Sequence, residues 1–280
     1  MKRRLWKLIL KKQSLLSTPF IIWILIGTII PLLAICYYGF TTRDGNWTFS
    51  NIWAIGRAEH ISALWLALVL ATVSTFICFV LAYPIALILK STKLGEKGFI
   101  VFIFILPMWM NFLLRTMAWQ VILEKGGIIN NMLANAGLPP LEIINTPAAV
   151  ILGMVYDFLP FMILPIYNTL IKIDDQIIEA AYDLGASWFT ANFKVILPLC
   201  KPGIASGVTM VFVPSLTTFV ISNMLGGGKI SLIGNIIEQE FTTSANWNLG
   251  SGLSLVMMFF IVVSMMLLSR VDKDKEGSFI

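Results

Sequence analysis

Charged residues are scarce in this chain. Of its 280 residues, 12% are Asp, Glu, Lys or Arg, whereas 58% are hydrophobic. A soluble domain carries roughly twice that share of charge, and the mean hydropathy of +0.85 points the same way. The composition therefore excludes an ordinary soluble domain and favours a protein that meets lipid over much of its surface.

Residue types that build metal, redox and hydrolytic sites are also rare. The three cysteines lie in or beside hydrophobic runs without a metal-binding or redox spacing, and the sole histidine, His60, falls in a predicted outer loop. The glycine-rich stretch 226–231 lacks the G-x-x-x-x-G-K-[ST] spacing of a phosphate-binding loop. We therefore expect no catalytic site, no metal and no cofactor on this chain.

The hydrophobic residues are gathered into six runs of about 20 residues, enough to cross a hydrocarbon core about 30 Å thick. Helices and closed barrels are the structures that satisfy the backbone in lipid, and runs of this length exclude barrel strands. We predict an all-α, polytopic membrane bundle of about six transmembrane helices. The predicted spans are 19–40, 64–89, 98–119, 148–170, 204–225 and 250–269.

The basic residues are divided unevenly between the two sides of the predicted membrane. With six spans both termini lie on one side, and placing them inside puts 15 of the 20 Lys and Arg residues there. Because this follows the positive-inside rule, we predict cytoplasmic N- and C-termini. The net charge of +5 then reflects topology and contact with membrane lipid, so we expect no nucleic-acid partner. The predicted parts are a basic arm at 1–18, a transmembrane domain at 19–270 and a charged tail at 271–280.

The predicted cytoplasmic loop 171–203 is the one long, mixed-charge, helix-forming segment between spans. Asp174 or Asp175 is placed to cap a helix and complement its dipole. Gly185 predicts the end of that helix, because glycine adopts the left-handed conformation at low cost. Ser187 then predicts the start of a second short helix.

The second helix is expected to run to about Val195 and to end at Leu197-Pro198, since proline disfavours a helical predecessor. Two short helices at an angle form a compact knob in which Glu179 offers an anchor for a basic partner. The alternative is a helix pair lying on lipid headgroups. Such helices prefer a Lys- and Arg-rich polar face, whereas residues 174–184 are acidic and carry neither. The pattern favours a protein partner.

Asp157 is the one acidic residue well inside a predicted span. A carboxylate in lipid is costly unless it meets protein, water or a cation, and the rings of Tyr156 and Phe161 beside it suit ammonium groups. One interpretation is a site for a cationic substrate. The other is a buried ion pair at a subunit contact, with Arg115 as a candidate partner, or a structural hydrogen bond.

Prolines and small residues also mark the predicted spans. Pro107, Pro160, Pro165 and Pro214 are expected to kink their helices, and together they argue modestly for a translocation path. The stretch Gly203–Gly207 forms a small-xxx-small face, from which we expect close contact with a second membrane subunit.

The spacing of the cytoplasmic loop resembles a known motif. Glu179-Ala180-Ala181, three residues, Gly185, nine residues and Val195-Ile196-Leu197-Pro198 are similar to the EAA loop of type I ABC importer permeases, which contacts the ATPase; the family pattern has Ile where this chain has Val195. The residues assigned to coupling by this resemblance are Glu179, Ala180, Ala181, Gly185, Val195, Leu197 and Pro198.

Further matches are similar to the PotB-type permeases of spermidine/putrescine ABC importers over nearly the whole chain. These matches are Pro107-x-Trp109-x-Asn111 with Arg115, Gly153-x-Val155-Tyr156, Leu159-Pro160-Phe161-Met162 and Leu232-Ile233-Gly234-Asn235. Many type I permeases carry an acidic residue after the serine that matches Ser215, but residues 215–219 hold none, so the second permease is expected to supply most carboxylates. The assigned substrate-pathway residues are Trp109, Asn111, Tyr156, Asp157, Phe161 and Ser215.

The resemblance implies a MetI-like fold and a non-enzymatic permease subunit in a bacterial cytoplasmic (inner) membrane. It also implies a PotC-like second permease, a PotA-like ATPase dimer that binds ATP and Mg²⁺, and an extracytoplasmic PotD-like polyamine receptor. The cycle would be alternating access, driven through the loop. The alternatives are an importer for another solute, such as thiamine or an iron complex, and a membrane scaffold without transport.

Overall fold

The computed structural model of this chain describes residues 18–92 and 106–273. These residues are overwhelmingly helical, and the β pairing found among them is the isolated bridge between Thr41 and Trp47. The all-α prediction is confirmed for this part of the chain. The predicted arm at 1–18 and most of the tail at 271–280 fall outside it.

One compact unit comprises residues 1–57 and 239–259. Residues 19–33 of its first helical span are exposed throughout, as expected of a surface that meets lipid or another chain. Asn248 Nδ2 donates to the carbonyl oxygens of Thr41 at 2.7 Å and Tyr38 at 3.1 Å, which joins the end of this span to α16. The elements are α2 (Thr18–Ile24), the π-helical turn η1 (Leu25–Ile29), α3 (Ile30–Gly39), α4 (Ser50–Trp53), the 3₁₀ turn η2 (Ala54–Gly56) and the first part of α16 (Trp247–Lys273).

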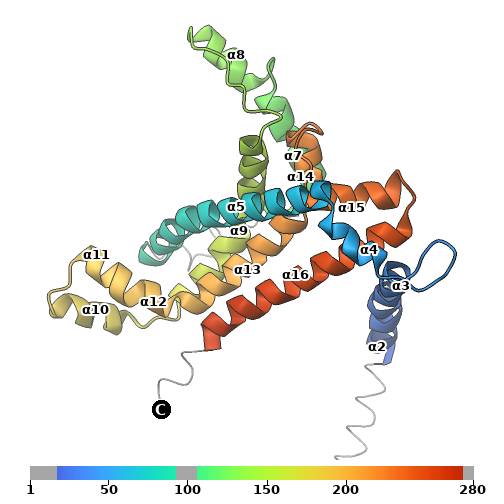
Figure 1. The fold of residues 1–280 in the computed structure, drawn as a ribbon. Coiled ribbons are helices and arrows are strands. Elements are labelled where there is room, and N and C mark those ends of the chain that lie inside the picture. Colours follow the sequence, from blue (N-terminus) through green and yellow to red (C-terminus); the bar gives the residue numbers. More distant parts are fainter. Residues whose placement is uncertain (1–17, 93–105, 274–280) are drawn as a thin grey trace, which may run out of the picture. The chain divides into compact units, whose positions relative to one another are not determined.

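The second unit comprises residues 58–238 and 260–280 and holds the candidate sites. Its core is formed by α5 (Ala58–Ser91), α9 (Pro147–Leu170) and α13 (Lys201–Thr217), which pack on one another pairwise. The helices approach closely because small buried residues recur along α5. Figure 1 shows α10, α11 and α12 at one end of α9 and α13, and α7 and α14 at the other. The bounds of the remaining helices of this unit are α7 (Phe112–Leu123), α8 (Ile128–Asn135), α10 (Asp175–Asp183), α11 (Trp188–Ala191), the π-helical η4 (Asn192–Ile196), α12 (Leu197–Leu199), α14 (Val220–Leu225) and the start of α15 (Ile233–Thr242).

The small residues at the start of α13 face α9 of the same chain. A Cβ built on Gly203 would lie 2.6 Å from the Pro165 oxygen, and one on Gly207 would lie 2.6 Å from Met162 Sδ. Both glycines are buried. The expectation that this face contacts a second permease is therefore wrong, because α9 already occupies it.

Four described helices are long and apolar enough to cross a membrane, namely Pro19–Gly39, Ala58–Ser91, Pro147–Leu170 and Trp247–Met266. They correspond to the first, second, fourth and sixth predicted spans. A bent pair, Trp188–Leu199 with Lys201–Thr217, makes five if it is counted as one span. The chain is a multi-pass membrane protein, with about the predicted number of helices.

The third and fifth predicted spans are not continuous helices. Part of span 98–119 lies outside the described residues, and in the rest the helix breaks at Met110 and restarts at Phe112. Asn111 causes the restart, because its Oδ1 accepts from Leu113 N at 2.9 Å and so caps α7. Span 204–225 breaks at Thr218, whose backbone is extended.

Candidate functional site

The loop 171–203 forms two short helices around a glycine turn. Asp174 caps α10 by accepting from Gln176 N at 3.0 Å. Gly185 has φ of +81°, and the Ala186 N–H bonds to the Ala181 carbonyl at 3.0 Å, a closure typical of a glycine-terminated helix. The predicted start and end of this first helix are confirmed.

The second helix begins where predicted but continues further. Ser187 Oγ accepts from Thr190 N at 3.3 Å, which confirms the cap. The helical path then runs through η4 and α12 to Leu199, so the expectation that Leu197-Pro198 ends it is wrong. Leu197 N–H bonds to the Asn192 carbonyl five residues back, and this wide turn accommodates Pro198. The chain bends by 68° after Leu199 instead.

We call residues 175–199 the coupling knob. Glu179, Ala180 and Gly185 are exposed on it, whereas the other residues assigned to coupling, namely Ala181, Val195, Leu197 and Pro198, are half-buried beneath. The structure thus separates residues able to contact a partner directly from residues that support them.

Apolar side chains also project from the coupling knob. Leu184 is 89% exposed, and Trp188, Phe189 and Phe193 are each more than half exposed. Exposed apolar clusters with a polar rim mark interaction surfaces. The three aromatic residues were not predicted as contact residues, although their grouping just after Gly185 in a charged loop was the available signal.

Lys90, in the last turn of α5, reaches the start of the coupling knob. Its Nζ lies 2.9 Å from Asp175 Oδ1 and donates to the Ile173 carbonyl at 2.9 Å. A groove of about 420 Å³ lies alongside, lined by both α5 and the knob. The sequence showed Lys90 only as a basic residue on the inner side of the membrane.

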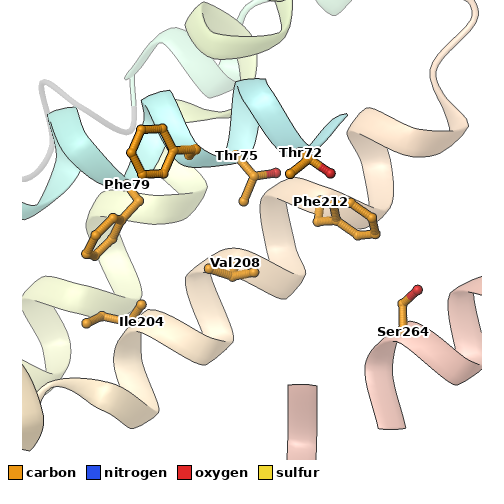
Figure 2. A pocket seen from close by; sticks show the side chains of 8 residues that line it. Thr72, Thr75, Phe79, Ile204, Val208, Phe212 and Ser264 are labelled. Atoms are coloured by element: carbon orange, nitrogen blue, oxygen red, sulfur yellow. The ribbon is translucent and has the colours of Figure 1, made fainter. Parts of the chain in front are cut away.

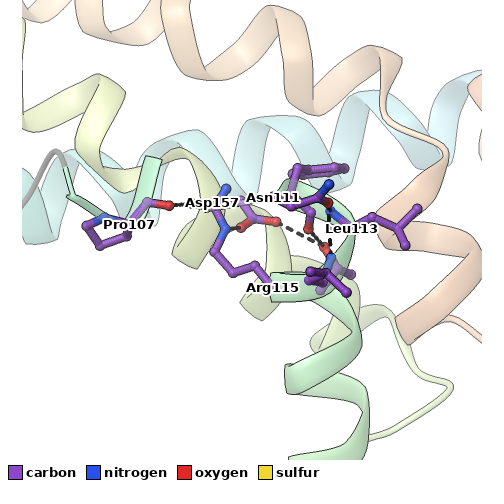
Figure 3. A network of polar contacts seen from close by, with 8 residues as sticks. Pro107, Asn111, Leu113, Arg115 and Asp157 are labelled. Atoms are coloured by element: carbon purple, nitrogen blue, oxygen red, sulfur yellow. Dashed lines mark hydrogen bonds and ion pairs between the residues drawn. The ribbon is translucent and has the colours of Figure 1, made fainter. Parts of the chain in front are cut away.

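A second polar cluster lies where α7 meets α9. Arg115 Nε lies 2.5 Å from Asp157 Oδ1, and both side chains are almost fully buried. Thr116 Oγ1 donates to the other Asp157 oxygen at 3.4 Å. Arg115 Nη1 also donates to the Pro107 carbonyl at 2.6 Å, across the helix break capped by Asn111 (Figure 3). Asp157 is thus engaged by a cation of its own chain.

The aromatic neighbours of this ion pair are partly accessible. The Tyr156 side chain is 38% exposed, its ring lies 5.2 Å from that of Trp119, and Arg115 Cζ lies 5.7 Å from its centroid. Phe161 is half-buried against Phe158. Arg115 therefore meets both a carboxylate and an aromatic face, the two groups that attract cations.

The remaining pathway residues are spread out. Trp109 is 74% exposed, and Asn111 uses its side-chain oxygen to cap α7. Ser215 is completely buried in α13. The structure therefore brings Asn111, Tyr156 and Asp157 to one region around Arg115, whereas Ser215 belongs to the packed core of α13.

An apolar cavity of about 460 Å³ lies between α5 and α13 (Figure 2). Its described lining contains no acidic residue, and Thr72 and Thr75 donate their hydroxyls to carbonyls of their own helix at 2.7 Å. A cavity without a carboxylate cannot balance ammonium charge. We therefore do not assign it to a cationic substrate. Its lining residues are Thr72, Thr75, Phe76, Phe79, Ile204, Val208, Phe212 and Ser264.

Comparisons with known proteins show the family of the chain. A family model for the "Binding-protein-dependent transport system inner membrane component" matches residues 96–276. The spermidine/putrescine transport system permease protein PotB of Haemophilus influenzae is 36% identical over 259 residues, which cover 90% of this chain and 91% of that protein. Its counterpart in Escherichia coli K12 is 34% identical over 254 residues, which cover 88% and 92%.

A similar fold is found in a bacterial ABC transporter involved in the import of the acidic polysaccharide alginate. A chain of its crystal structure superposes with a TM-score of 0.80 at 20% identity, covering 97% of this chain and 99% of that chain. At this identity the likeness concerns the fold alone. The predicted ABC importer permease architecture is confirmed.

Proposed function

The chain belongs to the family of binding-protein-dependent transport system inner membrane components, and on that premise we propose that it is the permease subunit of a spermidine/putrescine ABC importer. The observation that carries the substrate class is its identity of 34–36% to PotB proteins along about nine-tenths of their length. The alginate transporter shares only the fold, so its substrate does not transfer.

The permease works with a binding protein and an ATPase, and we propose specific forms of both. The ATPase is a PotA-like dimer that binds ATP and Mg²⁺, the receptor is PotD-like, and a PotC-like permease forms the other half of the pathway. This chain then needs no catalytic residue and no cofactor of its own. We place it in a bacterial cytoplasmic membrane with both termini in the cytoplasm.

We propose that the coupling knob docks on the ATPase. Its exposed aromatic residues supply apolar contact area, and Glu179 supplies a charge for a basic partner. The bend after Leu199 leads directly into α13, and the other end of the loop leads directly from α9. Motion of the coupling knob is therefore transmitted along the covalent chain to two core helices, α9 and α13.

For the substrate pathway we propose two kinds of residue. Tyr156, Trp109 and Phe161 provide aromatic faces for ammonium groups, and Tyr156 and Trp109 are exposed enough to do so directly. Asp157 and Asn111 position the region, since Asp157 pairs with Arg115 and Asn111 caps the helix that carries Arg115. Ser215 is buried, so it contributes through the shape of α13. The second permease supplies most of the carboxylates.

Uptake into vesicles tests this function. The chain is reconstituted with the three proposed partner proteins, and entry of labelled spermidine is measured with ATP inside and competing solutes outside. We expect putrescine to compete and thiamine and ferric complexes not to. Absence of spermidine entry, or entry that thiamine or ferric complexes reduce and putrescine does not, would contradict the proposal.

The variant Glu179→Lys separates transport from scaffolding in the same vesicles. We expect it to remain in the membrane but to lose substrate-stimulated ATP hydrolysis, because it places a positive charge against a basic partner. Glu142→Gln, an exposed outer-side carboxylate, is the matched control. Unchanged hydrolysis in Glu179→Lys would refute the coupling role.

A further inference from the structure

Lys90 stands at a junction between two elements that are far apart in the sequence. It lies in the last turn of α5, and its ammonium contacts Asp175 and the Ile173 carbonyl, which flank the start of α10. Its side chain is 16% exposed, although lysines usually extend into water. We call these two contacts the Lys90 clamp.

The electrostatic setting explains why the ammonium lies there. A cation is favoured at the C-terminus of α5 and disfavoured at the N-terminus of α10. Asp175, the first residue of α10, supplies the negative charge that offsets the second effect. The Ile173 carbonyl accepts a second N–H of the ammonium, so the clamp has two acceptors, each 2.9 Å from Lys90 Nζ.

The exposure of the acceptor indicates what the clamp does. Asp175 is 72% exposed, and an ion pair with one exposed partner contributes little to stability. A contact of low energy but fixed geometry is suited to positioning. Beside the clamp, the groove leaves α5 and the coupling knob incompletely packed against each other. The polar contacts of Lys90 therefore contribute more to the relative position of α5 and the knob than they would in a fully packed interface.

The position of the clamp adds a third route for motion. The coupling knob is joined covalently to α9 and α13, whereas α5 approaches it through space. Pro84 lies six residues before Lys90 inside α5 and removes one backbone hydrogen bond there. The helix end beyond Pro84 can therefore follow the knob if something holds the two together.

We propose that Lys90 is a positioning residue that makes the end of α5 move with the coupling knob when the ATPase acts on it. This inference rests on the proposed function only in naming the source of the motion. Without the clamp, motion of the coupling knob would be transmitted to α9 and α13, but the end of α5 would not move with it. ATP hydrolysis would then proceed with less transport per turnover.

The first test measures transport per ATP in Lys90→Met, which keeps the apolar stem and removes the ammonium. Spermidine uptake and ATP hydrolysis are measured in the same vesicles with the complete complex. We expect hydrolysis to continue while uptake per ATP falls roughly fivefold, within the range found for residues that couple distant sites. Lys90→Arg, which retains charge and donors, should keep most of the coupling. Lys172→Met, an exposed lysine of the same loop, should behave as the unmodified protein.

The second test measures the clamp directly and needs neither ATPase nor polyamine. Spin labels at Ser91→Cys and Gln176→Cys, both exposed, report the distance between the end of α5 and the start of α10. We expect a narrow distribution with Lys90 and a broader one with Lys90→Met, in the isolated chain in nanodiscs. Identical distributions, or unchanged uptake per ATP in Lys90→Met, would overturn the inference. Because the distance is read without transport, it decides the inference even if polyamine uptake fails.

Discussion

Replacing Asp157 with Asn tests whether the buried carboxylate serves the fold or the substrate. Asp157 and Arg115 side chains are 2% and 7% exposed, so removal of the carboxylate leaves a guanidinium charge buried without its counter-ion. Breaking such a pair costs about 3–5 kcal/mol. Arg115 keeps its bond to the Pro107 carbonyl and its place over Tyr156, which favours the lower end of that range.

A loss of about 3 kcal/mol corresponds to roughly 150-fold in the ratio of folded to unfolded protein. We expect Asp157→Asn to melt at a lower temperature in nanodiscs and to give less assembled complex. The double variant Arg115→Met with Asp157→Leu removes both charges at similar volume, and replacement of a whole buried pair is often neutral. It should regain most of the lost stability and, with it, most of the polyamine uptake.

Surface ion pairs provide the control. Lys125 and Glu142 lie 3.2 Å apart with both side chains more than two-thirds exposed, so Glu142→Gln should cost no more than about 1 kcal/mol. Asp157→Asn as stable as the unmodified protein would refute the reasoning. A double variant that regains stability but not uptake would instead assign Asp157 directly to the substrate.

Two further changes test the turns that hold the candidate sites. Gly185→Ala places a Cβ on a residue with φ of +81°, which costs about 1–2 kcal/mol and should speed amide hydrogen exchange at the end of α10. In the control Gly126→Ala the new Cβ meets no atom within 4 Å, so exchange at the end of α10 should stay unchanged. Equal exchange in the two variants would contradict the role of the turn. Asn235→Leu removes a buried amide that forms hydrogen bonds with Ser222, Leu232, Asn223 and Phe219. Thermal melting should show a loss of about 3 kcal/mol or more in the free energy of unfolding. The control Asn131→Leu, on the exposed face of α8, should show no such loss.

Local features of the coupling loop could be predicted from the sequence because their causes are local. Asp174 and Ser187 each cap a helix by accepting a hydrogen bond from an amide two or three residues further along the chain. Gly185 ends a helix because glycine adopts a positive φ at low cost. Each signal acts within one turn of chain. Proline was a poorer guide at Pro198, because Leu197 before it is helical and the π-helical turn through Asn192–Ile196 carries the helix on to Leu199.

Contacts between distant segments could not be predicted in this way. Nothing in the spacing of Lys90 and Asp175 shows that helix packing brings them together. Arg115 was a candidate partner of Asp157 by its charge, but the sequence placed that pair at a subunit contact and the structure places it within one chain. The small size of Gly203 and Gly207 predicted a close helix contact, but it did not predict that α9 of the same chain is the contacting helix. Residue type indicated the kind of contact, and the tertiary fold selected the partner.

The two predicted spans that proved broken are the most informative departures from the sequence pattern. A hydropathy pattern depends only on apolar composition, so it does not detect the helix restart at Asn111 or the extended backbone at Thr218. Free backbone groups at membrane depth are tolerated only where protein or water satisfies them. At the second break Asn235 supplies this by donating to the Phe219 carbonyl at 3.1 Å.

The broken segments also meet, since α14, which follows the second break, packs against α7, which follows the first. Continuous helices such as α5 can face lipid, whereas two chain breaks that pack together need a protein or aqueous surround. Arg115 belongs to α7 and contacts Tyr156 and Asp157 near the middle of α9. The same physical requirement therefore favours shielding both breaks from lipid where α7, α9 and α14 converge, at the end of α9 remote from the coupling knob.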